Sequence, residues 1–92
     1  MRTRYLVCYD IADEARLSRV HRFLKDIGVP MQYSVFLCSL TWPHVQEVLS
    51  RICDLIDATA DDVRIYPLPS GEPILSLGSG DRTPGGSWVV LP

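Results

Sequence analysis

The chain has 92 residues, of which 47% are hydrophobic and 22% are charged, and its formal net charge is −2. These values exclude a disordered chain and a strongly basic one, and the length allows a single hydrophobic core. We predict one domain over residues 1–92, with a core at about 3–68 and a C-terminal segment at 69–92. Because a small domain leaves much of its surface exposed, pairing with a second copy would stabilise it.

The cysteines and the apolar runs indicate where the protein works. Cys8, Cys38 and Cys53 are widely spaced and form no CxxC pair, so we expect neither a disulfide framework nor a zinc site. No apolar run approaches the roughly 20 residues that cross a bilayer. The N-terminus lacks the features of a signal peptide. We therefore predict a cytoplasmic protein without membrane contact.

The chain begins with a predicted strand and helix. Residues 5–10 form an apolar run that is too short for a helix and ends in Asp10. Asp13 is a suitable N-cap for a helix over residues 14–27, and Gly28 stands where a left-handed C-cap is expected. The apolar face of this helix recurs at steps of three and four, at Leu17, Val20, Leu24 and Ile27.

A second strand, a second helix and a third strand follow. We expect the second strand over residues 31–40, with Ser34 and Phe36 on the same face. Thr41 is the predicted N-cap of the second helix, and the third strand is expected over residues 63–68.

The C-terminal segment is rich in glycine and proline, and two short strands are expected within it. They cover residues 74–77 and 87–91, on either side of a loop at residues 78–86. The last strand can pair with the sheet of its own chain or with that of a second copy.

This order of elements predicts an α+β fold, a ferredoxin-like βαββαβ sandwich with an added C-terminal strand. Two helices would cover one face of an antiparallel sheet and leave the other face open. We expect this open face to be rich in Tyr5, Tyr9, Phe36 or their neighbours. A second copy of the chain is the expected cover, and the C-terminal strand of the same chain is the alternative.

Asp10 is the predicted functional centre, because a strand that ends in an acid displays that acid at the edge of the sheet. Mg²⁺ takes oxygen ligands and often uses one or two carboxylates, with water and substrate phosphate filling its other positions. Two Asp10 side chains related by a two-fold axis would suffice for one shared ion. The alternative is a structural role, in which Asp10 caps the next turn or pairs with Arg16 or Arg19.

Basic residues gather near the start of the chain, where six of the nine lie within the first 35 positions. Arg16 and Arg19 are three positions apart on the predicted helix, so their guanidinium groups could bind phosphate oxygens side by side. A solvated helix surface explains the same pattern. Ser34 could orient a phosphate or a water, and Phe36 could stack on a base, but packing is the interpretation we favour for Phe36.

Together these residues resemble a known family. The strings at residues 5–13 (YLVCYDIAD), 32–36 (QYSVF) and 63–68 (VRIYPL) are similar to those of the second core CRISPR-associated (Cas) protein family, the small partner of the spacer integrase. The likeness covers about residues 5–68 in order and spacing. Family members often carry an arginine just before the Gln-Tyr-Ser string, and this chain has Pro30 and Met31 there.

The resemblance implies a ferredoxin-like fold and a symmetric homodimer, often completed by exchange of C-terminal strands. It also implies a protein that bridges integrase dimers and holds the DNA to be inserted as a new spacer. Some members are metal-dependent endonucleases on single-stranded RNA or double-stranded DNA and use the aspartate that matches Asp10. The resemblance carries nucleic-acid contacts over to five further residues: Tyr9, Arg16, Arg19, Ser34 and Phe36.

The predicted function is therefore CRISPR adaptation by a homodimer that binds DNA or RNA and bridges the integrase subunits. A Mg²⁺-dependent endonuclease activity, with one ion shared by two Asp10 side chains, is part of this prediction. One alternative is a non-catalytic scaffold that holds DNA, in which Asp10 is structural. Two others are a virulence-associated toxin-type ribonuclease with a similar sandwich and a small-molecule regulatory domain.

Overall fold

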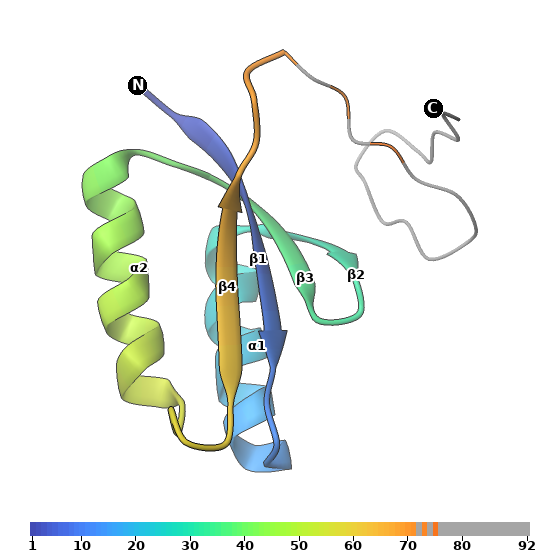
Figure 1. The fold of residues 1–92 in the computed structure, drawn as a ribbon, viewed down its shortest axis with the longest axis vertical. Coiled ribbons are helices and arrows are strands. Elements are labelled where there is room, and N and C mark those ends of the chain that lie inside the picture. The colour runs from blue at the N-terminus through green and yellow to red at the C-terminus, as the bar shows by residue number, and fades with distance from the viewer. Residues whose placement is uncertain (72, 74, 76–92) are drawn as a thin grey trace.

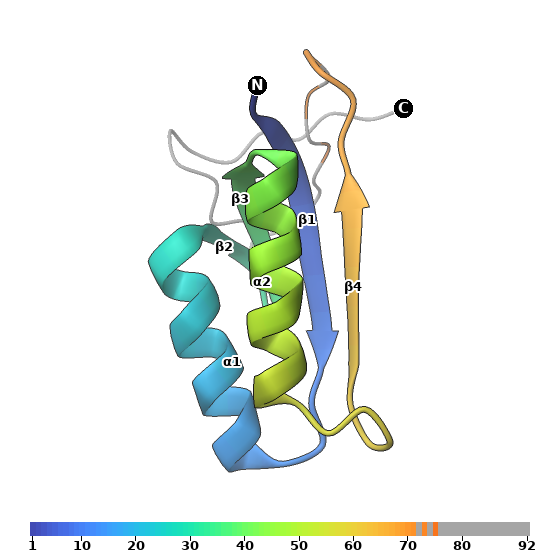
Figure 2. The same ribbon diagram turned by 90° about the vertical axis from the view of Figure 1, so that its left-hand side faces the viewer.

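Alternating strands and helices build a two-layer domain in a computed structural model that describes residues 1–71, 73 and 75 (Figure 1). The elements are β1 (Thr3–Asp10), α1 (Glu14–Ile27), β2 (Val29–Gln32), β3 (Val35–Leu40), α2 (Trp42–Leu55) and β4 (Asp62–Pro67). The four strands form one sheet in the order β2-β3-β1-β4, and every neighbouring pair is antiparallel. Both helices lie against the same face of this sheet (Figure 2). The predicted α+β sandwich is confirmed.

The C-terminal strands predicted at residues 74–77 and 87–91, and the loop between them, lie outside the described residues apart from residue 75. Among the described residues, no helix is long and apolar enough to cross a membrane.

Alternation along β1 assigns its side chains to two different faces. Tyr5, Val7 and Tyr9 are buried beneath the helices, whereas Leu6 and Cys8 are only half-buried on the opposite face. The expectation that Tyr5, Tyr9 and Phe36 lie on the open face is therefore wrong, because these rings belong to the core. Both faces of β1 carry apolar residues, so the alternation alone did not show which face the helices cover.

The two helices form where the sequence predicts them, and their caps explain why they begin there. The Asp13 side chain accepts a hydrogen bond from the Arg16 backbone N–H at 2.9 Å, and Thr41 Oγ1 accepts one from the His44 N–H at 3.4 Å. The residues that each helix buries are Val20 and Leu24 on α1, and Val45, Val48 and Ile52 on α2. Each such side chain stabilises the fold by roughly 1.5–3 kcal/mol relative to an exposed position.

Gly28 ends α1, but not through the left-handed conformation expected of it. Its φ is −151° and its ψ is −174°, which is extended backbone. A Cβ at this position would lie 2.5 Å from Cys38 Sγ and 2.8 Å from the carbonyl oxygen of Leu37. Glycine is needed here because the end of α1 packs directly against β3.

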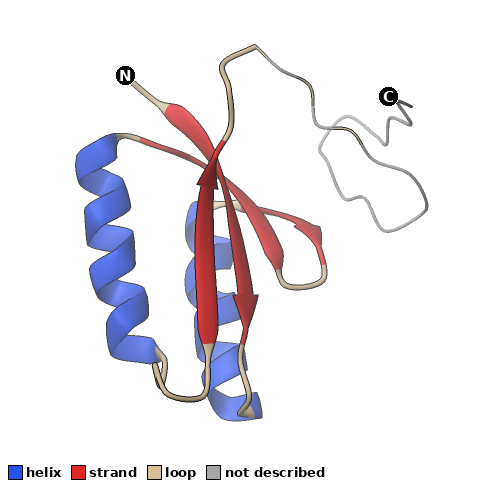
Figure 3. Cartoon of the chain, viewed as in Figure 1, coloured by secondary structure: helices blue, strands red, loops and turns tan. Residues whose placement is uncertain are grey.

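The segment predicted as one strand over residues 31–40 is a hairpin of two strands (Figure 3). Gln32 pairs with Val35, so Tyr33 and Ser34 form a two-residue turn in which Ser34 has a φ of 66°. Tight hairpin turns require positive φ and usually place glycine or asparagine there, and neither occurs in this turn. Ser34 therefore does not share a strand face with Phe36, which corrects that expectation.

Candidate functional site

Asp10 is the last residue of β1 and is exposed on the face of the sheet that the helices leave open. It lies directly opposite Asp62, the first residue of β4, which is also exposed. Like charges in directly opposed positions of an antiparallel pair repel each other. A bound cation would relieve this repulsion, so the pair is suited to holding one.

A basic side chain flanks this pair of acids. Arg64 Nε donates a hydrogen bond to Asp62 Oδ2 at 3.0 Å. Because Arg64 lies opposite Cys8 and Asp62 lies opposite Asp10, all four side chains share the open face. No role was predicted from the sequence for Asp62, which precedes the strand expected over residues 63–68. Its relation to Asp10 could have been inferred only from the antiparallel pairing of the first and last strands of the sandwich.

Carboxylate oxygens are the donors that Mg²⁺ prefers, and one or two of them are enough when water and phosphate complete its coordination. The Asp10–Asp62 pair fits this requirement. Within the described part of the chain, no group of three or more His, Cys, Asp and Glu side chains could hold a metal. A single copy of the chain therefore offers two carboxylates here, and water, substrate phosphate or a second copy would supply the other ligands.

Arg16 has a structural partner in Asp61. Its Nε donates to Asp61 Oδ2 at 2.8 Å, and its second guanidinium nitrogen donates to Oδ1 at 3.2 Å. The Asp61 side chain is 0% exposed, and it also accepts hydrogen bonds from the backbone N–H groups of Ala12 and Asp57, each at 2.9 Å. The hydrogen bonds from Arg16 hold the pKa of Asp61 far below its usual range, and the two backbone donors act in the same direction.

This network, which we call the Asp61 anchor, joins the segment after β1 to the segment before β4. It thereby fixes the strand ends that carry Asp10 and Asp62 (Figure 1). Arg16 pairs with Asp61 and not with Asp10, and Arg19 is exposed on α1. The two arginines therefore do not present a matched pair of free guanidinium groups.

Tyr9 and Phe36 lie on the opposite face of the sheet from Asp10. The Tyr9 hydroxyl shares a hydrogen bond with His21 Nδ1 at 3.1 Å. The Tyr9 and Phe36 rings stack with centroids 6.2 Å apart, and the His21 ring meets Phe36 edge-on at 5.3 Å. Burial raises the pKa of Tyr9, and the nearby Tyr33 adds to this rise. Because Phe36 is only 1% exposed, its position agrees with packing rather than with stacking on a base.

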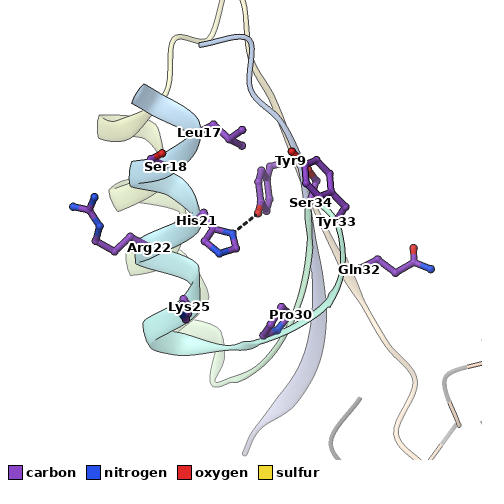
Figure 4. Close-up of a pocket in the computed structure, with 10 residues that line it drawn as sticks. All are labelled: Tyr9, Leu17, Ser18, His21, Arg22, Lys25, Pro30, Gln32, Tyr33 and Ser34. Carbon is purple, nitrogen blue, oxygen red and sulfur yellow. Dashed lines mark hydrogen bonds between the residues drawn. The ribbon is translucent and has the colours of Figure 1, made fainter. Parts of the chain in front are cut away.

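A groove of about 1000 Å³ lies between α1 and the β2–β3 hairpin (Figure 4). We call it the hairpin groove, and its lining includes Tyr9, His21, Arg22, Lys25, Pro30 and Tyr33. Pro30 forms part of the wall that β2 contributes. Sequence reasoning missed the groove, because its two walls come together only when the hairpin folds back beside α1.

The match of a family model described as "CRISPR associated protein Cas2" extends over residues 1–72. The chain belongs to the Cas2 family. A Cas2 relative from Thermodesulfovibrio yellowstonii, named CRISPR-associated endoribonuclease Cas2 2, is 55% identical over 89 residues, which cover 97% of this chain and 98% of the relative. A relative from Nitrosomonas europaea, named CRISPR-associated endoribonuclease Cas2 1, is 38% identical over 88 residues, covering 96% of this chain and 84% of its own length.

The same relationship holds in three dimensions. The crystal structure of Cas2 from Streptococcus pyogenes matches with a TM-score of 0.74 and 32% identity, over 82% of this chain and 99% of that chain. The resemblance to Cas2 seen in the sequence is thus confirmed, together with the ferredoxin-like class of fold. The nuclease names of the two relatives agree with the expectation of a nuclease.

Proposed function

We propose that this Cas2 protein acts in CRISPR adaptation as a homodimer that binds nucleic acid, bridges the integrase subunits and hydrolyses phosphodiester bonds with Mg²⁺. The observation that carries the proposal is the position of Asp10. It is exposed, it faces Asp62, and it stands at one end of a sheet face that neither helix covers. RNA as a substrate is supported by the names of the two relatives, which are endoribonucleases, and DNA is proposed beside it.

The open face supports the homodimer. Its central side chains are neighbours across β3, β1 and β4, namely Leu6, Cys8, Val35, Leu37 and Tyr66. Burial raises the pKa of the Cys8 thiol, so Cys8 contributes a neutral group to this surface. A second copy placed face to face about a two-fold axis would cover these side chains. In that arrangement each copy would also contribute its own Asp10.

Asp10 and Asp62 from both copies are the residues that would hold the cation. When bound, Mg²⁺ polarises a phosphate group and balances charge in the transition state. Arg64 pairs with Asp62 at 3.0 Å, and it would neutralise a phosphate at the same end of the open face by exchanging this partner for the phosphate. Arg16 acts through Asp61, as a positioning residue that keeps the ends of β1 and β4 together.

The test replaces Asp10 by asparagine, which keeps its shape and removes its charge. We expect Mg²⁺-dependent cleavage of labelled single-stranded RNA and double-stranded DNA to fall by at least about a hundredfold, while sedimentation still reports a dimer. Asp54→Asn removes a carboxylate from the exposed surface of α2 and should leave cleavage unchanged. Undiminished cleavage by Asp10→Asn would contradict the catalytic part of the proposal.

A non-catalytic scaffold is the second candidate. Two observations favour it: the Arg16 guanidinium is engaged with Asp61, and Phe36 is buried, so neither stands ready beside Asp10. If Cas2 only holds DNA, Asp10→Asn will support normal spacer acquisition, whereas Arg19→Glu or removal of residues 78–92 will reduce it. Loss of acquisition in Asp10→Asn, with the dimer intact, would favour the catalytic role.

A further inference from the structure

The hairpin groove is built from rings as well as polar groups. Tyr9 forms its floor through a ring that is buried and hydrogen-bonded to His21. Figure 4 shows the His21 ring pointing from α1 toward Tyr9 and the hairpin, with Pro30 on β2 at the end of the groove beside Lys25. A floor of flat rings held by a hydrogen bond suits a flat, polar ligand better than an aliphatic one.

Tyr33 stands at the rim of this groove with 90% of its surface exposed. It occupies the two-residue turn of the hairpin, where a small polar residue is usual. No packing role explains a large ring in this position. Exposed tyrosines on rigid turns are suited to stacking against nucleobases, and such stacking tolerates any base sequence.

The charge of the groove is opposite to that of the whole chain. Among the described residues that line it, Arg22 and Lys25 are cationic and none is acidic, although the protein carries a net charge of −2. In Figure 4 the Arg22 side chain extends from α1 away from Tyr9 and from the hairpin, on the outer side of the rim. A positive rim above a ring-lined floor is the combination that binds the phosphate and the base of a nucleotide.

We propose that the hairpin groove binds one unpaired nucleotide of a single-stranded nucleic acid. The base stacks on Tyr33 and lies over the His21–Tyr9 pair, and the adjoining phosphate contacts Lys25. The volume of about 1000 Å³ is sufficient for one nucleotide. A duplex is excluded because its bases are already stacked and paired.

The groove connects directly to the end of β1. The backbone N–H of Tyr9 donates to the carbonyl oxygen of Ser34 at 3.1 Å, so the Tyr33–Ser34 turn lies beside the residue that precedes Asp10. A strand held at Asp10 on the open face can therefore pass around this turn and place its neighbouring nucleotide in the groove. This inference rests on the proposed function for its substrate class, and it adds a binding site away from the acids.

The experiment titrates ¹⁵N-labelled full-length protein with uridine 5′-monophosphate and then with a short single-stranded oligonucleotide, and follows amide shifts by NMR. We expect shifts at Tyr33, Ser34 and His21. Tyr33→Ala should weaken oligonucleotide binding about tenfold, and Tyr33→Phe should retain it, because the ring stacks without its hydroxyl. Trp42→Ala is the control, because it removes another exposed ring, 61% exposed, from α2. It should leave the affinity for the oligonucleotide unchanged.

The phosphate contact is tested by the salt dependence of binding. Lys25→Gln should reduce the slope of log K against log salt by about one, whereas Arg51→Gln on the exposed surface of α2 should not. Absence of shifts in the groove, equal weakening by Trp42→Ala, or equal binding of a duplex would overturn the proposal. Repeating the titration in Asp10→Asn separates the two sites, because this variant should lose cleavage and keep the groove shifts.

Discussion

Asp61 and Asp62 are adjacent in the sequence and have opposite surroundings. Asp61 is enclosed and accepts hydrogen bonds from Arg16, Ala12 and Asp57, whereas Asp62 is exposed opposite Asp10. Asp61 is surrounded by donors and stabilises the fold. Asp62 accepts a hydrogen bond from Arg64 at the surface, faces another acid and is suited to holding a cation. The difference shows how a fold can tolerate the repulsion between Asp10 and Asp62. The hydrogen bonds to the neighbouring Asp61 stabilise the strand ends that hold the two acids in place.

The largest expected effect comes from Asp61→Asn. The amide cannot accept from all of the donors that surround Asp61, and it leaves the Arg16 guanidinium without a counter-charge. We expect the thermal unfolding midpoint to fall by about 10 °C, measured by circular dichroism. Asp62→Asn is the matched control, and its midpoint should stay within about 2 °C of the wild-type value. Equal midpoints for the two variants would mean that the Asp61 anchor does not stabilise the fold.

The pH dependence of stability should show the same contrast. The pKa values of Asp61 and Asp57 are both lowered in the folded state, chiefly by hydrogen bonds from Arg16 and Thr59 respectively. Their stabilising contribution is therefore complete well above the ordinary value of 3.8 and is lost as the pH falls below it. Chemical unfolding between pH 6 and pH 2 should show a steeper loss for the wild type than for Asp61→Asn. If the free energy of unfolding of the two proteins fell equally with pH, the Asp61 carboxylate would not be the source of this pH dependence.

The smallest effect concerns metal affinity. Asp62→Asn leaves the fold unchanged but removes one of the two carboxylates at the end of the open face. We expect the Mg²⁺ concentration needed for half-maximal cleavage to rise about tenfold, with a smaller loss of the maximal rate than in Asp10→Asn. An unchanged Mg²⁺ requirement would show that Asp62 is not a ligand and that its position opposite Asp10 serves another purpose.

Local signals explain which parts of the fold could be predicted. The helix over residues 14–27 follows from Asp13 and a regular apolar face, and the structure gives the same bounds. The β2–β3 turn was missed because Tyr33-Ser34 contains neither glycine nor asparagine, the residues that usually mark a two-residue hairpin turn. The role of Gly28 was misread because it depends on a contact with β3, which the sequence around it does not reveal.

Non-local pairings explain what could not be predicted of the site. Asp10 was found because it ends an apolar run, but its partner Asp62 lies on a strand more than fifty positions later. Arg16 appeared to be a free cation because Asp61 is 45 residues away in the sequence. In both cases the register between β1 and β4 decides the contact, and no local pattern encodes that register.

Helix α1 is held at both ends, by the Asp61 anchor near its start and by the close approach of Gly28 to β3 at its end. Because both of its ends are held, α1 cannot move away from the hairpin to make room for a larger ligand. Any widening of the hairpin groove must therefore come from the Tyr33–Ser34 turn. For the proposed nucleotide, Tyr33 and Ser34 would then govern whether a purine or only a pyrimidine base enters the groove.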